Sequence, residues 1–98
     1  MINGDVKEFV ESLHYEERTV FYNDRNYFFN GCCCLLNDSG DEVYRFEIYL
    51  LDDEGRGETI YSVQGATAQE CIDKFLSATL FNGKTFYEVE KDMTEIDW

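Results

Sequence analysis

The chain has 98 residues, of which 44% are hydrophobic and 16% aromatic, and its formal net charge at pH 7 is −13. This length suits one domain with one core, and the apolar content excludes a disordered chain despite the charge. With 8 Lys and Arg against 21 Asp and Glu, the chain would be repelled by bare nucleic acid and by anionic membrane surfaces. We therefore expect one domain, residues 1–98, whose partners are basic.

The N-terminal residues 1–5 lack the basic and apolar regions of a signal peptide. No apolar run approaches the length of about 18 residues that a membrane span needs. We therefore expect a cytoplasmic protein whose four cysteines are thiols rather than disulfides.

The first predicted element is an amphipathic helix that ends near His14 or Tyr15. Its apolar stripe recurs at helical spacing and consists of Val6, Phe9, Val10 and Leu13. Asp5 is the predicted N-cap, and Glu8 lies three positions further on, as in a capping box.

Four stretches then have the composition and alternation of β-strands: residues 19–22, 27–36, 42–51 and 58–64. The longest alternation predicts a central strand that places on one face Tyr44, Phe46, Ile48 and Leu50. Turn residues join the strands at positions 23–26, 37–41 and 52–57. Gly31, inside the second strand, indicates a bulge or a close approach of two backbones.

Two further helices follow, each opened by a capping box, at Thr67 and Glu70 and at Thr85 and Glu88. The apolar stripe of the first consists of Ala68, Cys71, Ile72, Phe75, Leu76, Thr79 and Leu80. The pair Asn82-Gly83 is the predicted stop of this helix. The second helix is short and directs inward Phe86, Val89 and Met93, and Trp98 is expected to be packed.

The predicted fold class is α+β: an antiparallel meander of three to four strands, with an N-terminal helix and two C-terminal helices packed on one face. The opposite face would carry Tyr49 and Leu51 among acids, with Tyr22 and Tyr61 as further candidates. Such a face suits a protein partner or a homodimer.

The cysteines and the single histidine give no catalytic signature. Cys32 and Cys34 share a strand face, and only Cys71 and His14 could join them in a metal site, without the usual paired spacing. Small buried hydrophobes are the favoured interpretation. We expect no catalytic residue, no metal and no cofactor; a metal-binding or enzymatic domain that uses these cysteines is the third alternative.

Acidic residues gather at the predicted hairpin ends and near the C-terminus, next to aromatic side chains. The candidate partner-binding residues are Asp38, Asp41, Glu47, Tyr49, Asp52, Asp53, Glu54, Tyr87, Glu88 and Glu90. Carboxylates on a small rigid domain can approximate the spacing of phosphates, so a basic groove is one possible partner. In the other interpretation the acids only solvate the surface and protect the sheet edges.

The layout resembles the small acidic anti-CRISPR proteins of Firmicute prophages, in particular the kind that blocks an RNA-guided nuclease by mimicking the DNA next to the target. The matching stretches are residues 37–40 (Asn-Asp-Ser-Gly), the helix at 72–78 followed by Asn82-Gly83, Phe86-Tyr87, and residues 92–94 (Asp-Met-Thr). The chain departs from that pattern in its loop 52–57 and fourth strand, and it lacks the acid-rich loop between the two helices, so no binding residue is carried over.

The resemblance implies a non-enzymatic interaction module from a phage or mobile element, which would occupy the DNA-binding groove of a nucleic-acid-binding enzyme. Its partner would be a basic protein surface, with aromatic side chains as anchors. The alternative is a small bacterial accessory domain that forms a homodimer through its mixed sheet face, with the acids only solvating. The sequence leaves both a monomer and a homodimer open.

Overall fold

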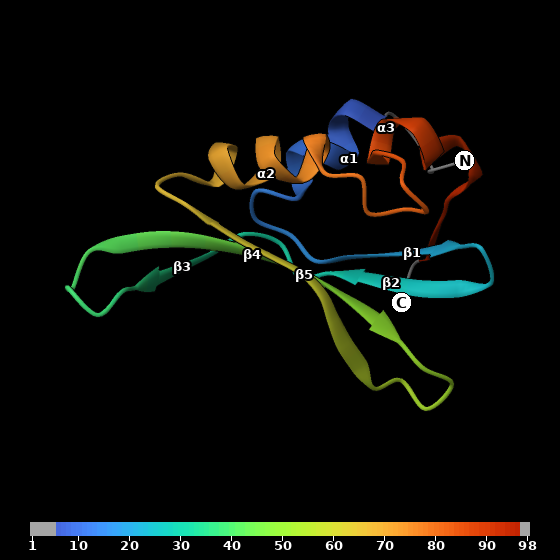
Figure 1. Ribbon diagram of the computed structural model, residues 1–98, viewed down its shortest axis with the longest axis horizontal. Coiled ribbons are helices and arrows are strands. Elements are labelled where there is room, and N and C mark those ends of the chain that lie inside the picture. Colours follow the sequence, from blue (N-terminus) through green and yellow to red (C-terminus); the bar gives the residue numbers. More distant parts are fainter. Residues whose placement is uncertain (1–5, 97–98) are drawn as a thin grey trace.

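The computed structural model describes residues 6–96 of the chain. Its elements, in order, are α1 Val6–Ser12, β1 Arg18–Tyr22, β2 Arg25–Phe29, β3 Cys33–Leu36, β4 Glu42–Leu51, β5 Gly57–Gly65, α2 Ala68–Ser77, α3 Phe86–Val89, the 3-10 turn η1 Glu90–Asp92, and β6 Thr94–Ile96. Figure 1 shows the three helices on one face of an antiparallel sheet, which confirms the α+β class. No helix within this part of the chain has the length and apolarity to cross a membrane.

Strand β4 is the centre of the sheet. One of its edges pairs with β5, and the other pairs with β3 near its start and with β2 near its end. Strand β1 pairs with β2, and β6 pairs with β1 at the far edge. Strand β6 was not predicted, because three residues are too few to show the alternation that is typical of a strand.

The predicted continuous strand at residues 27–36 is wrong, but the close approach of two backbones predicted at Gly31 is confirmed. The chain breaks between Phe29, which lies opposite Ile48, and Cys33, which lies opposite Arg45, so three residues face two. Gly31 has a φ of +75° there, and a Cβ at this position would lie 2.7 Å from the Glu16 carbonyl oxygen. Both the conformation and the close approach require glycine.

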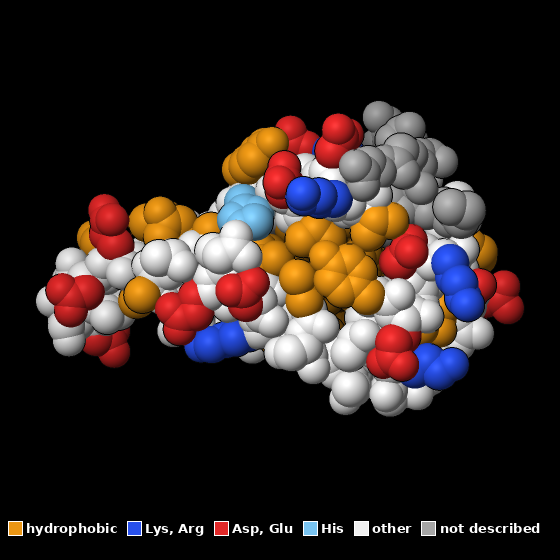
Figure 2. Space-filling view, turned by 90° about the horizontal axis from the view of Figure 1, so that it is seen from above, with side chains coloured by type: hydrophobic (Ala, Val, Ile, Leu, Met, Phe, Trp, Pro, Cys, Tyr) orange, Lys and Arg blue, Asp and Glu red, His pale blue; other side chains and the backbone are white. Residues whose placement is uncertain are grey.

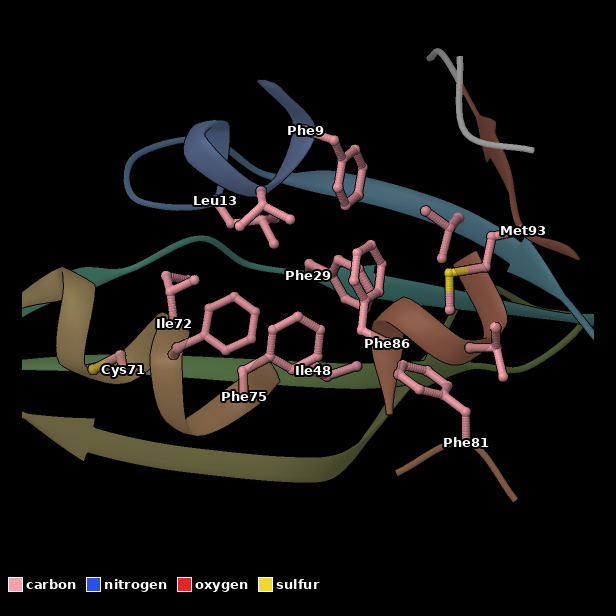
Figure 3. Packing of buried hydrophobic residues seen from close by; sticks show 14 residues of the cluster. Phe9, Leu13, Phe29, Ile48, Cys71, Ile72, Phe75, Phe81, Phe86 and Met93 are labelled. Carbon is pink, nitrogen blue, oxygen red and sulfur yellow. The ribbon is translucent and has the colours of Figure 1, made fainter. Parts of the chain in front are cut away.

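The core lies between the helices and the face of the sheet that they cover (Figure 3). Phe75 of α2 contacts Phe46 of β4 with ring centroids 5.1 Å apart, Phe86 of α3 at 5.5 Å and Phe29 of β2 at 5.6 Å. Phe9 of α1 stacks on Phe86 at 5.8 Å. The predicted apolar stripes of α1 and α2 therefore meet in one aromatic core, as expected from their spacing.

The predicted end of α2 at Asn82-Gly83 is wrong, because the helix ends at Ser77. Asn82 and Gly83 have φ values of 56° and 79°, and Phe81 and Lys84 exchange backbone hydrogen bonds across them. Two successive residues with positive φ are typical of a tight hairpin turn rather than of a helix C-cap. The turn places Phe81, which is 1% exposed, against the rings of Tyr22 and Tyr27.

Two other expectations need correction or fall outside the described residues. Tyr22 and Tyr61 lie on the helix-covered face, where they contact Phe81 and Phe75 respectively, and not on the mixed face. The predicted N-cap Asp5 and the predicted packing of Trp98 lie outside the described residues.

The break at Gly31 leads to a stability prediction. Gly31→Ala should lower the free energy of unfolding by about 3 kcal/mol or more, because the new Cβ adds a backbone clash to the strain of a positive φ. Gly40→Ala is the matched control: its φ is +83°, but no atom lies within 4 Å of the added Cβ. Gly40→Ala should lower the free energy of unfolding by only about 1–2 kcal/mol. Urea titration of both variants measures the two losses. Equal losses in the two variants would contradict the importance of the close approach.

Candidate functional site

The loop between β4 and β5 is built around Asp52. Its Oδ1 accepts hydrogen bonds from the backbone N–H groups of Glu54 (2.9 Å) and Arg56 (2.8 Å), and its Oδ2 pairs with Arg56 Nε at 3.1 Å. The bond from the Arg56 backbone, followed by that from Glu54, lowers the pKa of the Asp52 carboxyl. Glu54 also pairs with Arg56, at 3.0 Å, whereas Asp53 forms no ion pair with any described residue. Asp53 is therefore the acid of this loop that is free for a partner.

The turn between β3 and β4 presents Asp38 and Asp41 at the surface. Asn37 holds this turn, because its Oδ1 accepts from the backbone N–H groups of Ser39 (3.0 Å) and Asp41 (2.9 Å). Neither aspartate has an ion pair within residues 6–96, and both are exposed. This turn thus supplies two free carboxylates on a fixed backbone.

Glu47 and Tyr49 lie side by side on the face of β4 that the helices leave uncovered. Tyr49 Oη donates to Glu47 Oε1 at 3.2 Å, and Arg45 Nε lies 3.3 Å from the same oxygen. Burial and this hydrogen bond raise the pKa of the Tyr49 phenol. The Tyr49 ring contacts Phe28 of β2, with centroids 6.1 Å apart. Arg45 therefore balances the charge of the Glu47 carboxylate, and Glu47 orients the Tyr49 side chain.

The C-terminal candidates belong to the helix layer. Tyr87 is 53% exposed and packs on Phe86 at 5.7 Å. The Glu88 carboxylate accepts from Thr85 N at 3.0 Å and from Thr85 Oγ1 at 3.2 Å, which lowers the pKa of Glu88 and closes the predicted cap of α3. Glu90 is half-buried, and its Oε2 has no partner among the described residues. Tyr87 therefore presents an exposed ring, whereas the exposed Glu88 carboxylate is already engaged in the cap of α3.

The structure does not bring all the predicted residues together. Asp38 and Asp41 precede β4 and Asp52 and Asp53 follow it, so a strand of about 30 Å separates the two groups (Figure 1). The β4–β5 group instead borders a hollow of about 640 Å³ that it shares with residues of the β1–β2 hairpin, among them Asp24 and Asn26. Sequence reasoning missed this hollow, because it depends on strands β2 and β4 being neighbours.

Sequence reasoning also missed Phe28 and Phe21 on the uncovered face. Phe28 lies opposite Tyr49 in the register of β2 and β4, and Thr19 of β1 lies opposite Phe28. Phe21, two residues after Thr19, therefore faces the same way, and it is 41% exposed. The alternation of residues 18–29 already places Phe21 and Phe28 on defined faces of their strands. Only the register between the strands shows that these two faces are the same and are uncovered.

Residues 6–96 contain no group of three or more His, Cys, Asp or Glu side chains that lie close enough together to hold a metal ion. Burial, followed by the neighbouring Cys71 thiol, raises the pKa of Cys32 to about 12, and burial also raises the pKa of Cys71. Cys33 and Cys34 are exposed rather than buried, so the predicted buried role holds for Cys71 and only partly for Cys32.

The arrangement offers charge and aromatic surface for binding. His14 lies just after α1, where its ring contacts Glu11 O at 2.8 Å and Gln69 Oε1 at 2.9 Å.

Comparison of the chain with protein-family models, with curated proteins and with solved structures found no match.

The burial of the thiols predicts their reactivity. In the native protein, Cys33 and Cys34 should react promptly with a disulfide reagent such as DTNB, and Cys32 and Cys71 should react only after unfolding. Counting released thiolate with and without denaturant at about pH 8 measures this. Prompt reaction of all four thiols would contradict the packing of α2 over the break between β2 and β3.

The hydrogen bonds to Asp52 predict a pH dependence. Its pKa is lowered in the folded protein, so its stabilising effect is present above the pKa of the unfolded chain and is lost as the pH falls through the folded pKa. Stability measured by urea unfolding should therefore fall between about pH 5 and about pH 2, and Asp52→Asn should reduce that fall. Asp53→Asn, in which the changed residue accepts no hydrogen bond from described residues, should keep the wild-type profile. Identical profiles for the two variants would contradict the role of Asp52.

Proposed function

We propose that this protein is a non-enzymatic acidic interaction module that binds a basic protein surface and competes there with nucleic acid. The observation that carries the proposal is the excess of exposed carboxylates that form no ion pair within residues 6–96. Within residues 6–96, ion pairs with Arg18, Arg45, Arg56 and Lys74 engage only six acidic side chains, and the remaining acids have no ion pair. A partner with complementary charge would gain fast association from them.

The placement of these acids supports a groove-shaped partner. Free carboxylates stand on the β3–β4 turn and on the β4–β5 loop, the two projecting ends of the sheet. Figure 2 shows Asp and Glu side chains spread over the helix side of the molecule and along its projecting end. Acids distributed over a length of about 30 Å match the extent of several phosphates on a DNA strand. The resemblance to acidic anti-CRISPR proteins makes a nucleic-acid-binding enzyme the class of partner to test first.

A second candidate function is a homodimer that forms through the uncovered face of the sheet. It is favoured by one observation, the 41% exposure of Phe21 on that face. Against it stands the charge, because each copy brings a net charge of −13 to the interface.

The dependence of binding on salt concentration distinguishes the two candidate functions. The full chain, immobilised and exposed to bacterial lysate, should capture basic nucleic-acid-binding proteins at about 50 mM salt and release them at about 500 mM. Added duplex DNA should displace the same proteins, because both ligands compete for one basic groove. Recovery of the bait alone at both salt concentrations would contradict the proposal and favour self-association.

A matched pair of variants tests the role of the free acids. The triple variant Asp38→Asn, Asp41→Asn and Asp53→Asn should weaken capture by about tenfold or more, since it removes three unpaired carboxylates from the projecting ends. The variant Glu8→Gln, Glu11→Gln and Glu17→Gln changes the net charge by the same amount at exposed positions elsewhere. It should weaken capture much less.

A further inference from the structure

The face of the sheet opposite the helices carries an apolar strip of four side chains. No element within residues 6–96 covers this face (Figure 1). The strip crosses three neighbouring strands through side chains that share one face: Phe21 of β1, Phe28 of β2, and Tyr49 and Leu51 of β4. The rings of Phe28 and Tyr49 are in contact, and Phe21 is 41% exposed. An aromatic strip on an uncovered sheet face is typical of an interaction surface.

The strip ends at the acidic hollow. Leu51 and Asn26 lie opposite each other in the register of β4 and β2, and both line the hollow of about 640 Å³. Figure 1 shows the β4–β5 hairpin bending away from the helices, so its acidic end stands beside the uncovered face. The hollow's charged lining consists of Asp24, Asp52, Asp53, Glu58, Arg25 and Arg56, and Arg56 is already paired with Asp52. Negative charge therefore prevails where the aromatic strip ends.

Arginine fits both parts of this surface. A guanidinium group stacks on aromatic rings and pairs with carboxylates, and it is less strongly hydrated than a lysine ammonium group. A second copy of this chain would instead oppose acids to acids, at a net charge of −13 for each copy.

We propose that the uncovered sheet face, from Phe21 through Phe28 and Tyr49 to the hollow beside Asp53, is the docking surface for an arginine-rich protein partner. The proposal rests on the proposed function and assigns it to one face of the molecule. The rings of the strip anchor the partner, and the carboxylates of the hollow pair with its guanidinium groups. Glu47, held by Arg45, keeps Tyr49 oriented for this contact.

The test uses nona-arginine peptide as the probe and the full chain labelled with ¹⁵N. Titration at about 20 mM salt should shift the amide signals of β2, the second half of β4 and the β4–β5 loop. Shifts confined to α1 and α3 would overturn the assignment of the surface and leave the proposed function standing. Absence of any binding at this salt concentration would overturn the proposed function and the docking surface together.

Matched variants give a second readout. Tyr49→Ala should weaken peptide binding about three- to tenfold, whereas Tyr15→Ala, which removes a 74% exposed ring after α1, should not change it. Asp53→Asn with Glu58→Gln should weaken binding more than Glu8→Gln with Glu11→Gln, which changes the net charge equally. Equal effects within either pair would overturn the docking surface. A wild-type dimer in sedimentation that Tyr49→Ala dissociates would overturn it too, because a second copy would then occupy the face.

Discussion

The packing of Phe46 and Ile48 of β4 against the helix layer positions the rest of the structure. Both side chains are fully buried, and Phe46 contacts Phe75 of α2 at 5.1 Å. Because neighbouring residues on a strand point to opposite faces, burial of these two leaves Glu47 and Tyr49 on the other side. The same alternation that builds the core therefore also creates the uncovered aromatic surface.

The break at Gly31 lets one edge of β4 serve two strands. Strand β3 pairs with the first part of that edge and β2 with the last part, with one extra residue between them. Cys32 N donates to Leu13 O at 3.0 Å, so the segment after α1 is fastened to the sheet at the break. As a result the β3–β4 hairpin extends past the helices, and its turn presents Asp38 and Asp41 far from the core.

Local periodicity predicted the longer elements, but it predicted neither the short strand β6 nor the contacts between elements. The strand at residues 42–51 and the stripe of α2 were predicted because each contains its full period. Asn82-Gly83 was misread because the same pair can end a helix or close a two-residue turn, and only the packing of Phe81 decides. Tyr61 was assigned to the wrong face because its orientation depends on its pairing with Ile48, which the sequence of β5 alone does not contain.

The candidate site was harder to predict, because a count of acidic residues does not distinguish those that stabilise the fold from those that are free to bind a partner. Asp52 and Glu88 accept backbone hydrogen bonds that shape a loop and a helix start, and Glu47 holds Tyr49, so these carboxylates belong to the fold. Asp53 stands next to Asp52 in the sequence and makes none of these bonds. A carboxylate already satisfied by N–H donors has less to gain from a partner's cation than one facing only water. Binding energy should therefore come from the acids that the fold does not use, and from the rings beside them.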